Sequence, residues 1–273
     1  MIREIAGAKT LMGRANHSIS YDSLHDEFTI PNTLGQAILT FRGGANGDEA
    51  PIRVLQGPLT TLRNPDILAV DPIHNEIFVD ENYAIKVFSR EANGNVAPLR
   101  VLRGPADAPL NTQGLAVDPV HNLLVVSSRT GQRRSRVSGS ERTDRAEDSR
   151  LLIFNRTDEG NAAPKAVIGG PKSRYRRPGS TFILYPPKGW IVTSVGSQGR
   201  DDGERLAHAE VTSFIGVWSI NDNGDVPPKW TVGGPKGAVW QPKAIALDPK
   251  NKSLIVSDMG LNAVLTFFFP EMF

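Results

Sequence analysis

One short sequence pattern recurs five times along the chain. Its clearest copies read Leu-Ala-Val-Asp-Pro-Ile-His-Asn over 68–75 and Leu-Ala-Val-Asp-Pro-Val-His-Asn over 115–122. Each copy joins two short runs of apolar and β-branched residues through Asp, Pro and Asn, which is the pattern of a β-hairpin. The aligned anchor positions are Asp22, Asp71, Asp118, Tyr185 and Asp248. Such a repeat favours a repetitive all-β fold.

Two further strands follow each hairpin. The third strand ends in an aromatic residue such as Phe41 or Phe88, and a tight turn follows it, most often containing Asn-Gly. Asn-Gly between apolar runs is a strong hairpin signal. The fourth strand, for example 52–55 or 99–102, ends in Gly-Pro or Gly-Gly-Pro. Four strands in about 40 to 50 residues are the signature of a β-propeller blade.

The two ends of the chain predict the number of blades. Gly7 precedes its anchor by 15 residues, as Gly170 does, so residues 2–7 resemble a fourth strand without its first three. The last repeat stops after its third strand. The sequence therefore predicts an all-β, five-bladed β-propeller with four antiparallel strands per blade. Its ring is closed by the N-terminal strand, which completes the C-terminal blade and removes exposed sheet edges.

We expect one domain over 1–273. Its predicted blades cover about 17–62, 66–110, 113–177, 180–240, and 243–273 together with 1–12.

The repeats resemble those of NHL-type propellers and of their SMP-30-lactonase-like relatives. The segments that carry the resemblance are Gly-Leu-Ala-Val-Asp-Pro over 114–119 and Val-Ser-Asp-Met-Gly-Leu-Asn-Ala-Val over 256–264. The resemblance covers nearly all of the chain and implies a propeller. It implies no single activity, because this fold hosts enzymes, RNA binders and peptide binders.

Composition excludes several kinds of chemistry. The chain has no cysteine, so disulfides, thiolate metal sites and cysteine nucleophiles are excluded. Its net charge of +2 does not by itself indicate a polyanionic partner. No stretch approaches the roughly 20 apolar residues of a membrane span. We expect a soluble protein without a membrane partner, either cytoplasmic or secreted after removal of a signal, and its oligomeric state is left open.

Five different polar residues lie five positions before the anchors, where the innermost strands should open at the top rim of the channel. They are His17, Asp66, Gln113, Ser180 and Lys243. A histidine, a carboxylate, an amide, a hydroxyl and an amine that converge over one cup can supply a general base and donors for an oxyanion. The alternative is a water-filled channel lined by polar groups without chemistry.

Two insertions, about 127–150 and 194–213, lengthen the loops between second and third strands in blades 3 and 4. Long loops in compact domains are often functional. We expect His208 in the second insertion to reach over the cup as an acid or base, unless its segment is a short solvated helix. The first insertion is rich in arginine and, with Lys172 to Arg177, predicts a basic region for phosphate, carboxylate or RNA. A solvated loop paired with its own acids is the alternative. The predicted substrate-binding residues are Asn82, Arg129, Arg174 and Arg200.

A divalent metal ion is the cofactor that the carboxylates near the rim suggest. Asp66, Asp80 and Asp258 offer hard oxygen ligands, although residues that merely end strands would look the same. The repeated His25, His74 and His121 lie in separate hairpin turns. We expect them to make local turn hydrogen bonds and not to share an ion.

We predict a hydrolase or lyase whose site lies in the top cup and whose substrate is a small polar or anionic molecule such as a lactone, ester or phosphoester. One alternative is a non-catalytic NHL-like module that binds nucleic acid or an acidic partner through a basic top face. Another is a scaffold without a ligand.

Overall fold

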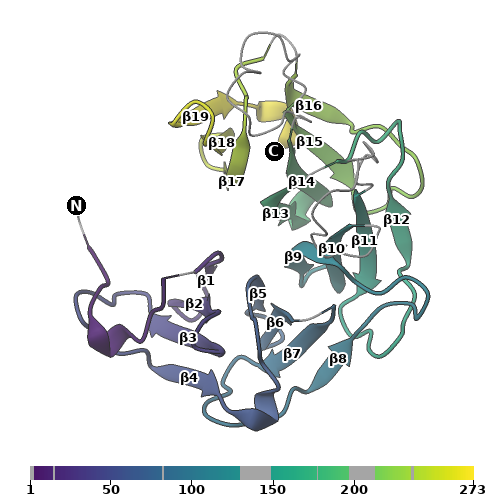
Figure 1. Cartoon of the computed structure of the whole chain (residues 1–273). Coiled ribbons are helices and arrows are strands. Elements are labelled where there is room, and N and C mark those ends of the chain that lie inside the picture. The colour runs from purple at the N-terminus through teal and green to yellow at the C-terminus, as the bar shows by residue number, and fades with distance from the viewer. Residues whose placement is uncertain are drawn as a thin grey trace, which may run out of the picture. The chain divides into compact units, whose positions relative to one another are not determined.

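The computed structural model describes residues 3–14, 16–81, 83–129, 149–176, 178–196, 213–234 and 237–273, with only the backbone of 178–181. In this part of the chain the strands form five sheets, one for each sequence repeat (Figure 1). Each sheet is called a blade and numbered in chain order.

The strands have the following bounds. Blade 1 contains β1 (Ser20–Asp22), β2 (Glu27–Asn32), β3 (Ala37–Arg42) and β4 (Arg53–Gln56). Blade 2 contains β5 (Leu68–Asp71), β6 (Glu76–Asp80), β7 (Ile85–Ser89) and β8 (Arg100–Leu102). Blade 3 contains β9 (Thr112–Asp118), β10 (Leu123–Arg129), β11 (Ser149–Asn155) and β12 (Ala166–Ile168). Blade 4 contains β13 (Pro178–Tyr185), β14 (Trp190–Val195), β15 (Phe214–Ser219) and β16 (Trp230–Gly233). Blade 5 contains β17 (Pro242–Asp248), β18 (Ser253–Asp258) and β19 (Ala263–Phe268). Short 3-10 helices are η1 (Ala8–Thr10), η2 (Pro58–Thr60), η3 (Pro186–Lys188) and η4 (Pro270–Met272).

The strand order confirms the predicted fold class, an all-β, five-bladed β-propeller. Strands that are consecutive in the chain are neighbours in every sheet, and the hairpins are antiparallel, with Ile77 opposite Phe88 in blade 2. Among the described residues, blade 5 has three strands. Pairing of residues 2–7 with β19, which would close the ring, stays a prediction.

Internal contacts divide the chain into two compact units, 1–124 with 154–163 and 125–153 with 164–273. Blades 1 and 2 belong to the first unit and blades 4 and 5 to the second. The division passes through the strands of blade 3, and the single domain stays a prediction. In the described residues, no helix has the length and apolar character needed to cross a membrane.

The N-terminal segment has the backbone structure of a fourth strand. Ile5 forms a parallel bridge with Gly47 in the third-to-fourth strand turn of blade 1. Leu55, in the fourth strand of blade 1, forms the same bridge with Gly94 in the corresponding turn of blade 2. Ile5 therefore occupies the position that a fourth strand takes beside the following blade.

A glycine turn ends this segment as it ends blade 1. Gly7 and Gly57 both have φ of 130° and precede η1 and η2. A Cβ on Gly7 would lie 2.3 Å from Oδ1 of Asp48, the atom that accepts the N–H of Lys9 at 2.7 Å. Any other residue would be strained at this φ, and its Cβ would clash with the Asp48 side chain, so glycine is required here. The local structure thus agrees with the predicted end of a blade at Gly7.

The recurring histidines make the predicted turn contacts. Nδ1 of His25 lies 2.7 Å from Oδ2 of Asp22, and both other copies repeat this contact at 2.8 Å. Oδ1 of Asp22 accepts the N–H groups of Leu24 and His25. In blade 5, Nδ2 of Asn251 donates to Oδ2 of Asp248 at 2.7 Å in the same turn. An Asx-type turn therefore holds these hairpins.

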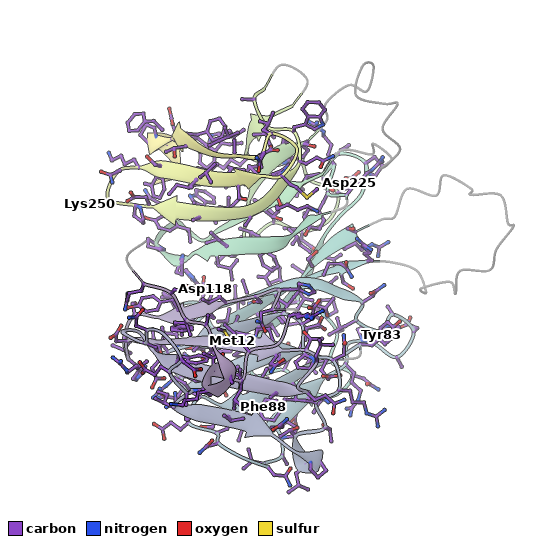
Figure 2. The ribbon with its side chains drawn as sticks, turned by 60° about the vertical axis from the view of Figure 1, so that its left-hand side comes forward. Met12, Tyr83, Phe88, Asp118, Asp225 and Lys250 are labelled. Atoms are coloured by element: carbon purple, nitrogen blue, oxygen red, sulfur yellow. The ribbon has the colours of Figure 1, made fainter. Side chains whose placement is uncertain are left out.

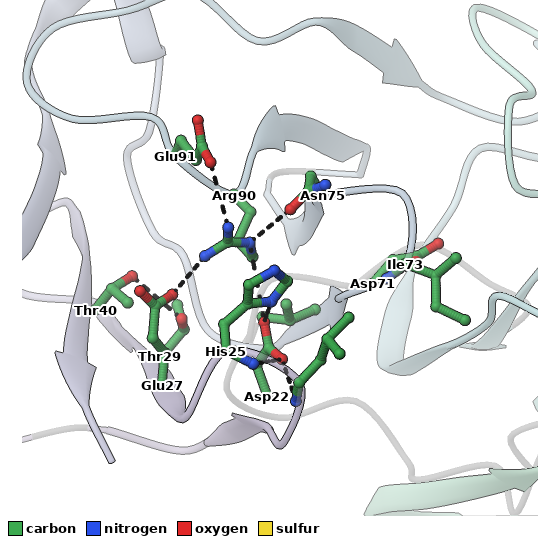
Figure 3. A network of polar contacts seen from close by, with 12 residues as sticks. Asp22, His25, Glu27, Thr29, Thr40, Asp71, Ile73, Asn75, Arg90 and Glu91 are labelled. Carbon is green, nitrogen blue, oxygen red and sulfur yellow. Dashed lines mark hydrogen bonds and ion pairs between the residues drawn. The ribbon is translucent and has the colours of Figure 1, made fainter. Parts of the chain in front are cut away.

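Ion networks of low exposure join blades 1 and 2 (Figure 3). Arg90, which directly follows β7, donates from Nη1 to the carboxylate of Glu27 in blade 1 at 2.7 Å. Its Nε donates to Oδ1 of Asn75 at 2.8 Å. Arg53 of blade 1 binds the same Glu27 carboxylate. The next junction repeats the network with Glu76, Arg100 and Arg156.

An apolar core lies between blades 1 and 2. Buried Ile38 and Leu55 from blade 1 pack in one cluster with Ile77, Val79 and Phe88 from blade 2. Phe88 is labelled in Figure 2. This core and the ion network fix the two blades against each other, and so fix the starts of their innermost strands.

Candidate functional site

A histidine and an aspartate from two blades pair at the start of the innermost strands. His17 precedes β1, Asp66 precedes β5, and Nδ1 of His17 is hydrogen-bonded to Oδ1 of Asp66 across 49 positions of sequence. The side chain of His17 is 60% exposed and that of Asp66 36%. The pair is therefore accessible to a ligand from solvent.

Two serine hydroxyls set the register that brings the pair together. Oγ of Ser18 accepts the N–H of Leu68 at 3.4 Å and donates to the carbonyl of the same residue at 3.3 Å. Oγ of Ser20 accepts the N–H of Val70 at 3.2 Å. These hydroxyls satisfy backbone groups on the open edge of β5. Because His17 directly precedes Ser18, it is held opposite the segment that leads into β5.

The segment that carries Asp66 is anchored from both sides. The carboxylate of Glu81, 1% exposed, accepts the N–H groups of residues 63–64 at 2.8 and 2.9 Å. The Thr33 hydroxyl donates to the carbonyl of Pro65 at 2.7 Å. A side chain on a fixed backbone loses less conformational freedom on binding a ligand, so Asp66 is pre-positioned for His17.

The hydrogen bond determines which ring nitrogen of His17 is basic. An ionised carboxylate only accepts hydrogen bonds, so the neutral imidazole keeps its proton on Nδ1 and presents the lone pair of Nε2. The turn histidines differ, because their aspartates are at most 3% exposed and also accept N–H groups of their own turns. Turn geometry therefore explains those three pairs and does not explain His17 with Asp66.

A second carboxyl lies near this pair. Burial is the main reason that the pKa of Asp80, at the end of β6, is raised to about 7. The Thr112 hydroxyl opposes this shift, and the charges of Asp66 and Glu81 add to it. Asp80 is therefore partly protonated at neutral pH. At the corresponding position the other blades have Pro31, Ser127, Ser194 and Ser257.

The other predicted rim residues lie inside strands. Gln113 is in β9, and its Nε2 donates to the carbonyl of Thr112 at 2.8 Å. Lys243 is an exposed residue of β17. Ser180 is in β13, and its side chain lies outside the described residues. The structure brings His17 and Asp66 together, and the site roles of the other three stay predictions.

The three predicted metal ligands lie in two different units. Asp258 is 1% exposed, and its carboxylate accepts the N–H groups of Trp240, Gln241 and Leu261. It anchors its loop as Glu81 does in blade 2. Among the described residues, no group of three His, Asp or Glu side chains is placed to hold a metal ion. The metal site stays a prediction.

Most of the predicted substrate-binding residues cannot be compared with the structure. Asn82, Arg200 and His208 lie outside the described residues, as does most of the arginine-rich insertion. Arg129 ends β10, and the guanidinium of Arg174 lies over the ring of Phe214 at 4.5 Å. The basic binding region stays a prediction.

Sequence reasoning missed the residues that position the pair. Ser18, Thr33 and Glu81 act on segments far away in sequence, so no local pattern marks them. A comparison of the repeats offers one signal. Glu81 aligns with Asn32 and Asp258, and all three side chains accept backbone N–H groups at the end of a second strand.

Comparisons with known proteins bear on the fold. No family model matches the chain, and no curated protein matches it significantly. The NHL-type or SMP-30-lactonase-like resemblance therefore stays a prediction.

Two solved structures share the architecture. Hydrazine synthase of Kuenenia stuttgartiensis is similar with a TM-score of 0.60 at 12% identity, over 92% of this chain and 64% of that one. The chain thus spans less than two thirds of the hydrazine synthase chain. A nidogen/laminin complex is similar with a TM-score of 0.55 at 12% identity, over 94% of this chain and 81% of that one. At this identity the likeness shows the fold alone, and the chain is a β-propeller.

Proposed function

We propose that the protein is a hydrolase or lyase whose active site contains His17 and Asp66, in the top cup of the propeller channel. The observation that carries the proposal is the hydrogen bond between Nδ1 of His17 and Asp66 across two blades. A histidine oriented by a carboxylate is the usual arrangement of a general base. The exposure of the pair leaves room for a substrate, and nothing in the hairpin repeat requires it.

In this proposal the pair activates water. Nε2 of His17 takes a proton from a water molecule, and the resulting hydroxide attacks the carbonyl carbon or phosphorus of a small lactone, ester or phosphoester. The bond to the leaving oxygen breaks, and a proton is returned to that oxygen. Asp66 stabilises the imidazolium that forms while the proton is held. In the lyase form, the same base removes a proton from carbon, and a leaving group departs from the neighbouring atom.

Asp80 is a suitable second group for this chemistry. A general acid works best when its pKa is near the operating pH, and burial raises the pKa of Asp80 to about 7. A carboxyl of ordinary pKa would have no proton to give at neutral pH. Asp80 therefore supports a role as proton donor to the leaving group, with His17 as the base.

The test is turnover of a panel of lactones, esters and phosphoesters by the wild type and His17→Ala. We expect the substitution to lower kcat by about 10²–10⁴-fold, the usual contribution of a general base. His121→Ala is the matched control, because its histidine also pairs with an aspartate through Nδ1 but lies in a hairpin turn. Equal activity of His17→Ala and wild type on every substrate that is turned over would exclude this site.

A further inference from the structure

A small pocket lies at the junction of blades 2 and 3, beside the connection from β8 to β9. Its volume is about 260 Å³, and all the described residues that line it belong to one compact unit. Three polar side chains contribute to the lining, those of Tyr83, Arg103 and Asn161. The rest is apolar or glycine, including Pro105 and Pro109, and no carboxylate lines the pocket in the described part of the chain. The pocket therefore combines one positive charge with apolar walls.

Asn161 lacks the partner that its counterparts have. The residues at the same position of the other turns between third and fourth strands are Asp48, Asn95 and Asp225. Oδ1 of each accepts a backbone N–H from the residues that follow the adjoining fourth-strand segment, in all three cases at 2.7 Å. Within the described residues, the side chain of Asn161 makes no hydrogen bond. Its amide is therefore able to donate to a ligand in the pocket.

The connection after β8 explains this difference. Gly104 follows β8 with φ of 73°, whereas φ is 122° to 130° in its counterparts Gly7, Gly57 and Gly170. A Cβ on any of these three would clash with the side chain of the adjoining turn, but a Cβ on Gly104 would meet Leu110 at 3.1 Å. Leu110 is completely buried, so the connection is folded back on itself. The chain thus leaves β8 in another direction and leaves space beside the turn of blade 3.

Two further residues distinguish this pocket from the corresponding one in blade 1. Tyr83 and Arg103 take the positions of Gln36 and Gln56, which line the pocket beside blades 1 and 2. Arg103 is exposed, and its guanidinium has no hydrogen-bond or ion-pair partner in the described residues. Its backbone is held by the carbonyl of Gly160, which accepts its N–H at 2.7 Å. An unpaired guanidinium on a fixed backbone is a suitable partner for an anion.

Tyr83 is at a position that suits a small polar residue better. It directly precedes the alanine at the start of the third strand, as Gln36 and Asn262 do, and φ is positive in all three. Its φ of 64° is unusual for a bulky residue. The residue is also 49% exposed, in the loop between β6 and β7 (Figure 2). Packing within the blade does not explain an aromatic ring here, whereas contact with a ligand does.

We propose that this pocket binds a small aromatic monocarboxylate, with Arg103 and Asn161 at the carboxylate and Tyr83 and the two prolines at the ring. A guanidinium pairs with a carboxylate through two parallel N–H···O bonds, and the Asn161 amide adds a third donor. An aromatic ligand gains from the tyrosine ring beyond the burial of its apolar area.

The charge of the pocket selects the anion. One guanidinium without a carboxylate in the described lining balances a single negative charge, so a monoanion suits the pocket better than a phosphate monoester dianion. The described lining includes neither His17 nor Asp66. The proposed site therefore does not depend on the hydrolase or lyase activity.

Isothermal titration with benzoate, benzyl alcohol and phenyl phosphate tests the proposal. We expect the wild type to bind benzoate more tightly than the neutral alcohol or the dianion. Arg103→Gln should bind benzoate at least about 10-fold more weakly, which is 1.4 kcal/mol. Tyr83→Gln should also weaken benzoate binding. Both substitutions introduce the residue that blade 1 has at the same position, so both variants should melt close to the wild type.

Arg63→Gln is the matched control, because Arg63 is an exposed arginine of the corresponding connection after β4 and lines the other pocket. It should bind benzoate like the wild type. The proposal is overturned by absence of benzoate binding at millimolar concentrations, or by equal affinity of wild type and Arg103→Gln. Tighter binding of phenyl phosphate than of benzoate, or a loss of benzoate binding in Arg63→Gln alone, would overturn it as well.

Discussion

Nδ1 of His17, in blade 1, is hydrogen-bonded to Oδ1 of Asp66, in blade 2. The bond depends on the serine hydroxyls that hold β1 beside β5 and on the Glu81 carboxylate that fixes the Asp66 segment. It differs from the three histidine–aspartate pairs of the hairpin turns because it joins two blades and because both of its side chains are accessible to solvent. This relationship has direct consequences for activity.

Replacing Asp66 by Asn should lower kcat by about 10²–10⁴-fold with little change in KM. An amide can donate to Nδ1, which would leave the ring proton on Nε2 and remove the base. Steady-state kinetics on the best substrate of the panel measures this effect. The variant should melt close to the wild type, because Asp66 is a third exposed. A rise in KM with an unchanged kcat would contradict the assignment of Asp66 to base orientation.

Asp80 should make stability fall as the pH rises. Its pKa in the folded protein is about 7, raised mainly by burial from an ordinary value of 3.8. Between these two pKa values the folded chain keeps a proton that the unfolded chain releases. The contribution of Asp80 to the free energy of unfolding is therefore fully present below about pH 4 and is lost as the pH rises through 7.

Asp80→Asn removes this titration, because an amide is neutral at every pH. Relative to the wild type, its free energy of unfolding should therefore increase between pH 4 and pH 8, by on the order of 2–4 kcal/mol. Urea denaturation at the two pH values measures the difference. A difference that does not change with pH would mean that Asp80 is ionised in the folded protein throughout.

Removing Glu76 from its ion network should lower the free energy of unfolding, whereas replacing the whole network by apolar residues should lower it much less. Burial alone would raise the pKa of Glu76, but hydrogen bonds and charges from Arg100 and Arg156 outweigh it and hold the pKa below its ordinary value. This stabilisation is present above the pKa that Glu76 has in the unfolded protein, and it is lost as the pH falls through the lower pKa that Glu76 has in the folded protein. Glu76→Ala should lower the free energy of unfolding by about 3–5 kcal/mol, since it removes the ion-pair partner of the largely buried Arg100 and leaves Arg156 only its 3.7 Å contact with Asp71.

The repeat supplies an apolar replacement for this network. The positions of Glu76, Arg100 and Arg156 are taken one blade later by Leu123, Ala166 and Ile220. The triple variant E76L/R100A/R156I should therefore recover most of the stability lost in Glu76→Ala. Chemical denaturation of both variants at pH 7 compares them. A triple variant as unstable as Glu76→Ala would show that the charges contribute more than an apolar contact.

Ring closure can be tested with a disulfide, because the chain has no cysteine of its own. In blade 1, Ile38 of β3 pairs with Leu55 of β4. The same register predicts that Val264 of β19 pairs with Ile5. When only the described residues are considered, 69% of Val264 is exposed to solvent.

Ile5→Cys with Val264→Cys should therefore form an intramolecular disulfide in mild oxidant. Peptide mass spectrometry and non-reducing electrophoresis would identify it. Ile5→Cys with Ser253→Cys, at the other end of the blade 5 hairpin, is the control that should not cross-link. A disulfide that joins two chains would instead indicate exchange of the N-terminal strand between copies.

The hairpins were predictable because each is determined locally. Asp22 and His25, three residues apart, make the turn that the sequence predicts. Phe88 lies one residue before the end of β7, as Phe41 does in β3. Even the fourth-strand character of residues 2–7 follows from the spacing of Gly7, and the bridge from Ile5 to Gly47 agrees with it. Apolar alternation and turn residues act over a few positions, so the sequence alone could indicate them.

The candidate site depended on contacts between blades. The sequence indicated His17 and Asp66 as separate rim residues, but serine hydroxyls and Glu81 decided that they pair. The pKa of Asp80 is raised mainly because packing around its carboxyl excludes water. Burial and charge proximity are properties of packed neighbours far apart in the chain. The sequence by itself therefore determined the blades, and the tertiary structure decided which of their polar residues meet.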